Sequence, residues 1–257
     1  MNRELRVTIA EIIQRAGEGH IPSSYSIVDI LDVLYGRFLR YDAARPAWEE
    51  RDYFILSKGH GSAALYAVLQ KYGFFSRQEL FRKSQEGSIL GGHPDSTQVP
   101  GAEASTGSLG HGAVTAMGIA LGLRIQGKAN RVITLIGDGE SNEGTIWEMA
   151  LVAANLELGN LGVIVDKNGS TDQILKMPHL RQKWEAFGWR VSEINGHDEA
   201  AIAAALSGIT FRHRGQPHVI IAQTVKGKGV SFMEVHGPWH HRIPTELEMA
   251  QIRAELA

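Results

Sequence analysis

The stretch spanning residues 131–173 most constrains the fold of this chain. It opens with an apolar run at 132–136, breaks at the turn Gly137-Asp138-Gly139-Glu140, and continues as a helix-like segment from about residue 141. It then returns through a second apolar run at 163–165 to a polar turn at 166–170. Two short apolar runs joined by a helix are typical of a β-α-β unit. The stretch therefore predicts two neighbouring parallel strands with a glycine-rich turn after the first.

Polar side chains follow both predicted strands. Asp138 follows the first strand, and Asn168 follows the second, 30 residues later. Ligands of open parallel sheets bind beyond the carboxyl ends of the strands, and Mg²⁺ prefers oxygen ligands of these two kinds. Gly137 and Gly139 allow the backbone to approach a bulky anion, which would face the free N–H groups of the next helix. Either segment alone fits an ordinary turn, but their joint placement favours a metal and diphosphate site.

The rest of the chain extends this unit to a complete α/β fold. Further strands are predicted at 52–57, 189–194 and 218–224, and helices at 3–16, 26–38, 63–69, 113–125 and 200–206. Ser23 and Ser24 are expected to cap the second helix, and Thr245 and Glu248 have the spacing of a capping box before a terminal helix. Residues 88–112 form a long irregular segment, which is usually functional. We predict one domain over residues 1–257, with an open, mostly parallel sheet and helices on both faces.

The composition limits the classes of function. The net charge is −2 and no long basic run occurs, so nucleic-acid binding is not expected. The chain has no cysteine, which excludes disulfides and thiolate metal sites. It begins without the apolar core of a signal peptide, and no window approaches the roughly 18 apolar residues of a membrane helix. A soluble, cytoplasmic protein without a membrane segment is therefore expected.

Four histidines lie in glycine-rich loops at the ends of predicted elements. These are His20, His60, His93 and His240. A single loop histidine is most often a surface residue, but four in a sheet protein with a cofactor motif suggest a converging polar site. Histidine suits such a site because it can transfer protons near neutral pH or donate hydrogen bonds to phosphate.

With these motifs, the chain resembles the N-terminal, diphosphate-binding half of a transketolase along essentially its whole length. The motif Gly137-Asp138-Gly139, followed by Asn168, is similar to the thiamine diphosphate motif, whose Asp and Asn hold the divalent metal. The resemblance therefore implies thiamine diphosphate, with Mg²⁺ or Ca²⁺, as the cofactor. The other motifs that carry it are Gly19-His20, Ser57-Lys58-Gly59-His60, Gly92-His93-Pro94, Thr106-Gly107-Ser108-Leu109-Gly110, Glu143-Gly144, and Trp239-His240 with Pro244 close behind.

The resemblance also implies roles for individual residues. The metal ligands would be Asp138, Asn168 and the carbonyl oxygen of Ser170. His60 and His240 would lie beside the diphosphate, while His20 and His93 would face the sugar hydroxyls or the reacting carbon. Glu143 would join a carboxylate network at a subunit interface and, with the four histidines, complete the catalytic set. The remaining residues expected to contact the cofactor are Gly107, Ser108, Leu109, Gly137, Gly139 and Glu140.

The length of the chain implies a second polypeptide. A complete transketolase continues into a pyrimidine-binding domain and a third domain, for which 257 residues leave no room. The chain therefore resembles the smaller subunit of a split transketolase. It would transfer a two-carbon ketol unit from a ketose, such as a ketose phosphate, to an aldose. We expect two copies of each chain, with the cofactor bound between unlike chains.

Three positions depart from the family pattern. Pro22 is displaced by one residue from the usual Gly-His-Pro-Gly motif, His111 stands where Gln is common, and His241 stands where Gly is common. Each departure lies close to a predicted site histidine or to the cofactor loop.

Three other functions stay open from the sequence. The α subunit of a 2-oxoacid dehydrogenase also divides its site between chains, but the Ser-Lys-Gly-His and Gly-His-Pro elements favour transketolase. The deoxyxylulose phosphate synthase group is disfavoured because the chain is short. A non-catalytic binding half would keep the fold, although the retention of Asp138 and Asn168 argues against it.

Overall fold

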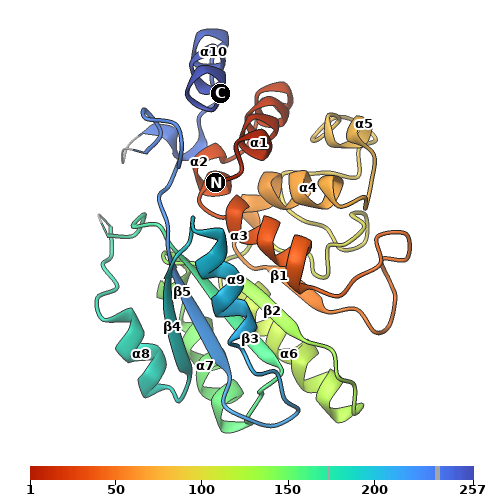
Figure 1. Cartoon of the computed structure of the whole chain (residues 1–257), viewed down its shortest axis with the longest axis vertical. Helices are drawn as coiled ribbons and strands as arrows, with labels where there is room; N and C mark the ends of the chain where they lie inside the picture. The colour runs from red at the N-terminus through yellow and green to blue at the C-terminus, as the bar shows by residue number, and fades with distance from the viewer. Residues whose placement is uncertain (173, 235–237) are drawn as a thin grey trace.

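The fold is built on a five-stranded sheet in which every strand pair is parallel (Figure 1). The computed structural model describes residues 1–172, 174–234 and 238–257. The strand order is β1-β2-β3-β5-β4. The prediction of an α/β fold with an open parallel sheet is confirmed. The strands are β1 (Tyr53–Leu56), β2 (Val132–Gly137), β3 (Leu161–Lys167), β4 (Arg190–Asn195) and β5 (His218–Gln223).

The register of the two central strands decides where their following turns lie. Gly137 at the end of β2 is paired with Asp166 of β3. Because paired parallel strands end at the same edge, the turns that contain Asp138 and Asn168 leave the sheet side by side. The hydrogen bond from the Asp138 N–H to the Asp166 carbonyl oxygen, at 3.1 Å, extends the pairing into this turn.

Helices cover both faces of the sheet. In Figure 1, α3 and α9 lie over one face and α6, α7 and α8 over the other. The α-helices are α1 (Arg3–Ala16), α2 (Ile21–Tyr25), α3 (Val28–Val33), α4 (Ser62–Lys71), α5 (Arg77–Leu80), α6 (His111–Ile125), α7 (Gly144–Asn155), α8 (Leu180–Ala186), α9 (Glu199–Ser207) and α10 (Glu246–Glu255). A π-helical turn, η1 (Leu34–Phe38), and three 3₁₀ turns, η2 (Gly59–Gly61), η3 (Glu140–Asn142) and η4 (Pro238–His241), complete the described elements.

Two hydrophobic cores lie on opposite faces of the sheet. Successive side chains of a strand point to opposite faces. Accordingly, Ile133 and Ile164 enter the core beneath α3, α4 and α9, while Val132 and Val163 enter the core beneath α6, α7 and α8. The sheet is therefore buried on both sides, as parallel sheets generally are.

Two predictions about helix starts are wrong. The predicted helix at 26–38 corresponds to α3 and η1, and a separate short helix, α2, precedes it. Ser23 and Ser24 lie inside α2 and therefore do not cap the next helix as predicted. Pro22 favours the start of α2, because its fixed φ and missing N–H suit the first turn of a helix. After β2, the 3₁₀ turn η3 precedes α7, which begins at Gly144 and not near residue 141.

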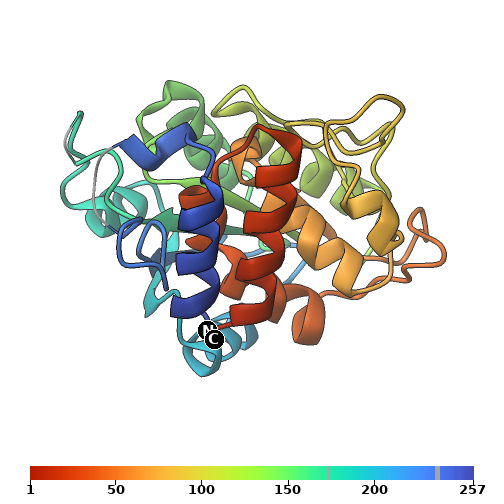
Figure 2. The same cartoon turned by 90° about the horizontal axis from the view of Figure 1, so that it is seen from above.

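The first and last helices pack side by side (Figure 2). Arg253 of α10 forms an ion pair of 3.2 Å with Glu11 of α1. The predicted capping box is present, with the Thr245 N–H donating to Glu248 Oε2 at 2.8 Å and the Glu248 N–H donating to Thr245 Oγ1 at 3.3 Å. Among the described residues, no helix is both long enough and apolar enough to cross a membrane.

Candidate cofactor site

A cavity of about 430 Å³ lies beyond the carboxyl ends of β1, β2 and β3. This is where open α/β sheets bind their ligands, and the volume is within the usual range for small-molecule sites. The cavity brings together residues that are distant in the sequence. Its lining consists of Ser23, Lys58, His60, Leu109, Gly137, Asp138, Gly139, Glu140, Asn142, Asn168, Ser170, Thr171, Ile174, Leu175, Lys226 and His240.

Backbone N–H groups donate hydrogen bonds to the side chains of Asp138 and Asn168 and so join the two turns. The Gly139 N–H donates to Asp138 Oδ1 and the Gly169 N–H donates to Asp138 Oδ2, each at 2.7 Å. The Ser170 N–H donates to Asn168 Oδ1 at 3.0 Å. The three predicted metal ligands, Asp138, Asn168 and Ser170, therefore lie in two adjoining turns at the edge of the cavity.

Asp138 is a buried carboxylate that lacks a cationic partner among the described residues; its exposed fraction is 4%. Burial and the nearby Asp166 charge raise its pKa. The described residues also contain no group of three or more His, Asp or Glu side chains that could hold a metal ion alone. One carboxylate, one amide and one carbonyl oxygen suit a hard divalent cation whose remaining ligands come from a bound phosphate and water. The site thus fits Mg²⁺ or Ca²⁺ held together with a diphosphate.

Asp166 is a second buried carboxylate, and protein groups satisfy it. Lys58 Nζ lies 2.6 Å from Asp166 Oδ2, and both side chains are almost completely buried. Ser26 Oγ and Asn168 Nδ2 donate to the same carboxylate at 2.7 and 2.8 Å, and Thr224 Oγ1 also donates to it. The bond from Asn168 Nδ2 fixes the orientation of this amide, so that Asn168 Oδ1 turns away from Asp166. Asp166 therefore orients both a predicted metal ligand and the cavity lysine.

Cationic side chains line the same cavity as the acidic turns. Lys58 and Lys226 both line the cavity, and Lys226 Nζ is 2.9 Å from His240 Nδ1. Burial and the Lys58 charge lower the pKa of Lys226. Together with His60 and His240, the two lysines make a wall suited to a diphosphate. Neither lysine was assigned a site role from the sequence, because a single lysine carries no spacing pattern.

Three of the four predicted histidines converge, and a fourth ring joins them. The ring centroid of His20 lies 5.3 Å from that of His60, 5.2 Å from that of His240 and 4.6 Å from that of His241. Burial and the neighbouring imidazoles lower the pKa of His20 to about 4, and burial with the Lys58 charge places the pKa of His60 far below its usual range. Both rings are therefore neutral at pH 7.

His93 lies in the neighbouring loop, close enough to His20 for its charge to help lower the pKa of that ring. It is exposed, and the Tyr66 hydroxyl donates to its carbonyl oxygen at 2.8 Å. Its ring packs against Gly107, where an added Cβ would lie 3.2 Å from the imidazole. The predicted site residues Gly107 and Ser108 are therefore placed next to His93, while Leu109 enters the cavity.

Glu140 joins the cofactor loop to the sheet. This buried carboxylate accepts hydrogen bonds from Ser57 Oγ at 2.5 Å, from the Gly110 N–H at 2.9 Å and from the Gly137 N–H at 3.1 Å. Since three protein donors occupy its oxygens, Glu140 holds the walls of the cavity together. Glu143, the other predicted acidic residue, is exposed at the N-cap of α7.

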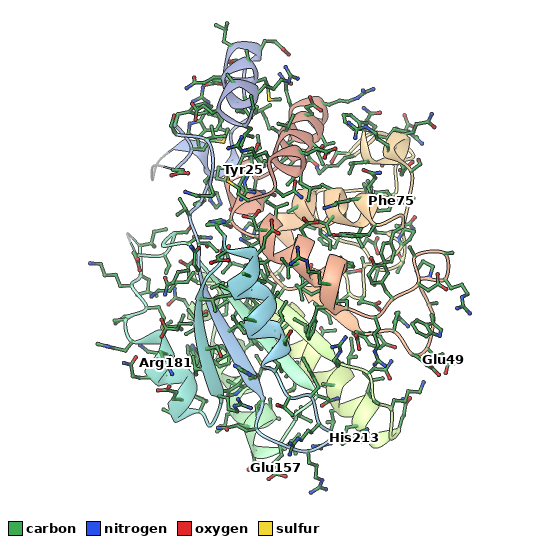
Figure 3. All side chains as sticks on the ribbon, in the orientation of Figure 1. Tyr25, Glu49, Phe75, Glu157, Arg181 and His213 are labelled. Carbon is green, nitrogen blue, oxygen red and sulfur yellow. The ribbon has the colours of Figure 1, made fainter. Side chains whose placement is uncertain are left out.

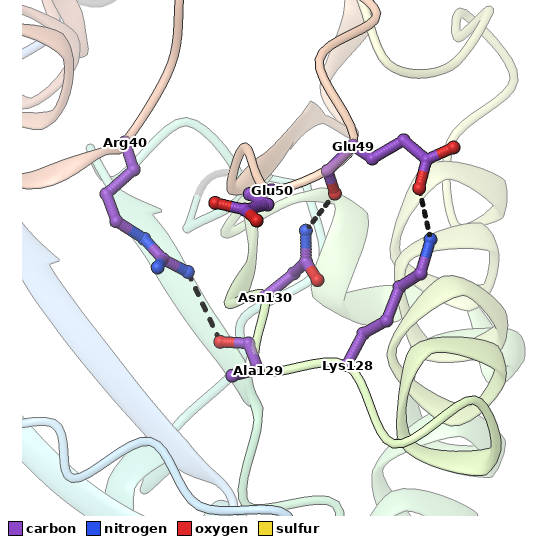
Figure 4. Close-up of a pocket in the computed structure, with 6 residues that line it drawn as sticks. All are labelled: Arg40, Glu49, Glu50, Lys128, Ala129 and Asn130. Carbon is purple, nitrogen blue, oxygen red and sulfur yellow. Dashed lines mark hydrogen bonds and ion pairs between the residues drawn. The ribbon is translucent and has the colours of Figure 1, made fainter.

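A second cavity of about 400 Å³ lies at the opposite, amino end of the strands (Figure 4). Its polar groups bond mainly to one another. Lys128 Nζ lies 3.3 Å from Glu49, Asn130 Nδ2 donates to the Glu49 carbonyl oxygen at 2.7 Å, and Arg40 donates to the Ala129 carbonyl oxygen at 3.3 Å. Because these groups are already paired, the cavity at the carboxyl edge is the candidate site.

Known proteins match the whole chain. The family model described as the thiamine diphosphate-binding domain of transketolase matches residues 1–256. The chain is 38% identical to one of the subunits of the apulose-4-phosphate transketolase of Phocaeicola vulgatus, over 93% of this chain and 86% of that protein. It is 39% identical to the SqwG subunit of the 6-deoxy-6-sulfo-D-fructose transketolase of a Clostridium species, over 98% of this chain and 93% of that protein.

Solved structures show the same fold. The transketolase from Leishmania mexicana superposes with a TM-score of 0.92 and 30% identity, covering 99% of this chain and 40% of the longer chain. Human transketolase is 36% identical over 96% of this chain and 40% of its own length. The family predicted from the sequence motifs is thereby confirmed. The chain belongs to the transketolase family, in which it corresponds to the thiamine diphosphate-binding domain.

Proposed function

We propose that this chain is the diphosphate-binding subunit of a two-chain transketolase, which moves a two-carbon ketol unit from a ketose to an aldose. The observation that carries the proposal is the cavity at the sheet edge, which is lined both by two lysines and by a buried carboxylate that has no cationic partner among the described residues. The relatives that this chain covers almost completely are named as transketolase subunits, and this favours the two-chain arrangement. The match to a transketolase domain also favours this function over that of a 2-oxoacid dehydrogenase.

The cofactor would be held by its diphosphate and a divalent cation. In this proposal Asp138, Asn168 and the carbonyl oxygen of Ser170 hold Mg²⁺ or Ca²⁺. Lys58, Lys226, His60 and His240, which also line the cavity, contact the diphosphate. Bound thiamine diphosphate supplies the carbanion chemistry that breaks and makes the carbon–carbon bond.

The histidines would bind the sugar and exchange protons with it. His20 is neutral at pH 7, because its pKa is about 4. A neutral imidazole can donate one ring N–H to a sugar oxygen and accept a hydroxyl proton at its other nitrogen. We propose that His20 performs this exchange, that His241 contacts the same substrate, and that His93 reaches it from the neighbouring loop.

The partner chain would cover the mouth of the cavity. Ile174 and Leu175 line the cavity, yet they are 89% and 60% exposed. Large apolar side chains at the rim of a site mark a surface that another molecule covers. We propose that a subunit with a pyrimidine-binding domain lies there, that Glu143 belongs to the interface, and that the assembly contains two copies of each chain.

The substrate class follows from the named relatives. One is named for a sugar phosphate and the other for a sulfosugar, so both names specify a sugar with an anionic group. We propose a ketose of this kind, either a phosphate or a sulfonate, as the donor for the present enzyme.

Calorimetric titration of thiamine diphosphate with Mg²⁺ tests the proposal, using this chain alone and mixed with the product of the neighbouring gene. Binding that tightens with the partner, together with ketol transfer from a phosphorylated or sulfonated ketose, is the expected result. Absence of binding in both samples would contradict the proposed function and leave a non-catalytic member of the family.

A further inference from the structure

We infer that His197 is a positioning residue, which fixes the backbone beside Lys226 and thereby sets this lysine in the cofactor cavity. His197 lies outside the cavity, in the loop between β4 and α9. The inference rests on the proposed function in one respect, because it takes the anion opposite Lys226 to be the cofactor diphosphate.

His197 makes two hydrogen bonds through its two ring nitrogens. Nδ1 lies 2.8 Å from Asp29 Oδ2, and the Val225 N–H donates to Nε2 at 2.9 Å. The side chain is only 9% exposed, so water does not replace either partner easily. One imidazole thus connects a buried carboxylate to the residue that precedes Lys226.

These partners determine which nitrogen carries the proton. A backbone N–H can only donate, so Nε2 must present its lone pair to Val225. The proton is then on Nδ1, where it donates to Asp29. Arg6 donates to both oxygens of Asp29, at 2.8 and 2.7 Å. The structure therefore requires a neutral imidazole with the Nδ1–H tautomer.

The backbone on both sides of Lys226 is held by separate contacts. Thr224 Oγ1 donates to Asp166, and the Gly227 N–H donates to the Pro22 carbonyl oxygen at 3.0 Å. Gly227 has a φ of +77°, and a Cβ there would lie 2.3 Å from the Met233 carbonyl oxygen, so this turn admits only glycine. Within this short segment, His197 holds the residue directly before Lys226. With the backbone fixed, the Lys226 side chain is directed towards His240 and the cavity.

A purely structural role would predict a different pattern of effects. If His197 only satisfied buried groups, its loss would weaken cofactor binding through general loosening, whether or not Lys226 was present. If His197 acts through Lys226, its effect should vanish once the lysine is removed. A double-mutant cycle separates these two cases.

The test measures the affinity of the assembled two-chain enzyme for thiamine diphosphate with Mg²⁺. The variants are His197→Ala, His197→Gln, Lys226→Ala and the double variant His197→Ala/Lys226→Ala. Gln at position 197 keeps an acceptor for the Val225 N–H. The matched control is His213→Ala. His213 is exposed and lies near the lower end of the molecule in Figure 3, at the amino end of β5 and away from the cofactor cavity.

We expect His197→Ala to weaken cofactor binding about tenfold, as is typical for residues that orient a ligand-contacting group. His197→Gln should stay within about threefold of the wild type, and the double variant should match Lys226→Ala within the same margin. An undiminished effect of His197→Ala in the Lys226→Ala background would overturn the inference.

Nuclear magnetic resonance gives a second readout that needs no cofactor. Imidazole ¹⁵N spectra should show the Nδ1–H tautomer for His197, and the Val225 amide should exchange faster in His197→Ala than in His213→Ala. An Nε2–H tautomer or an unchanged Val225 exchange rate would contradict the inference. If the wild-type assembly binds no thiamine diphosphate, the proposed function fails, while these spectra still decide whether His197 holds the loop.

Discussion

Asp138 and Asp166 end neighbouring strands, but only Asp166 is paired with a cation in the described part of the chain. Burial opposes the charge of both carboxylates. The Lys58 ammonium and hydroxyl donors hold the pKa of Asp166 below its ordinary value, whereas the pKa of Asp138 is raised. Carrying an unpaired buried charge costs stability unless a ligand compensates for it. The contrast supports our proposal that Asp138 binds the ligand and that Asp166 supports the site.

Replacing Asp138 by Asn should therefore abolish binding of thiamine diphosphate with Mg²⁺ while the fold is retained. We expect a loss of affinity of at least about a hundredfold, since a direct metal ligand is removed. Calorimetry measures the affinity, and circular dichroism checks the fold. Asp172→Asn is the control, because Asp172 is an exposed acid in the adjoining turn. Equal affinities of the two variants would contradict the proposal that Asp138 is a metal ligand.

His218 should make the stability depend on pH. It is buried, its Nδ1 lacks a partner among the described residues, and burial with the Arg190 charge lowers its pKa to about 4. Between this value and the ordinary pKa of about 6.5, the unfolded chain binds the proton and the folded chain does not. Folding stability therefore falls as the pH decreases through this window.

Urea unfolding of the wild type and of His218→Phe measures this linkage. Between about pH 7 and about pH 4.5, the wild type should lose on the order of 2 kcal/mol more than the variant. His213→Ala, which removes an exposed histidine, should follow the wild type. Parallel pH profiles for the wild type and His218→Phe would show that His218 keeps an ordinary pKa.

At the scale of elements, strands were predicted from sequence more completely than helices. All five strands were expected, because each is a short apolar run next to a turn. The strand order could not be read, since β4 and β5 are adjacent in the sheet while β5 also pairs with β3. The short helices α2, α5 and α8 were missed because they span too few turns to show a helical pattern.

The candidate site could be predicted only where its residues belong to a local sequence pattern. Asp138 and Asn168 could be placed together, because each directly follows a predicted strand. Lys58, Asp166 and Thr224 come together through contacts between residues at least 58 positions apart in sequence, and no local pattern records such contacts. His93 was expected with the other histidines; the structure places its ring against Gly107, where its charge still lowers the pKa of His20.

The capping box of α10 makes a testable contribution at this scale. Thr245→Ala removes the side chain that accepts from the Glu248 N–H. We expect a loss of about 1 kcal/mol in the free energy of unfolding, as is usual for an N-cap. Urea unfolding measures it, and Thr210→Ala, at an exposed loop position, should change stability by less than about 0.5 kcal/mol. A loss no larger than that of the control would mean that the capping box does not contribute to the free energy of unfolding.

At the scale of the whole molecule, one sheet separates two hydrophobic cores. Ile9 lies in one core and Ile146 in the other, and both are fully buried. The strands contribute side chains to both cores, so that neither can form without the sheet. We propose on this basis that the chain folds as one domain.

Ile9→Ala and Ile146→Ala should then lower the same cooperative unfolding transition. Each should cost about 2–5 kcal/mol, the usual range for this truncation in a core. Near- and far-ultraviolet circular dichroism should give coincident urea curves for both variants. Ile125→Ala, at a position that is 76% exposed, serves as the control. A variant that unfolds in two separate steps would show that the cores are independent.

The order of the strands leaves β1 and β4 at the two edges of the sheet. An open strand edge can pair with another chain and so begin aggregation. Here β1 contains only four residues, and β4 carries exposed Arg190 and Glu193, with Glu193 3.6 Å from Arg181 of α8. Short length at one edge and charge at the other both oppose the addition of a foreign strand. Both edges thus oppose edge-to-edge polymerisation of the protein, and we expect an ordered assembly with other chains to use other surfaces.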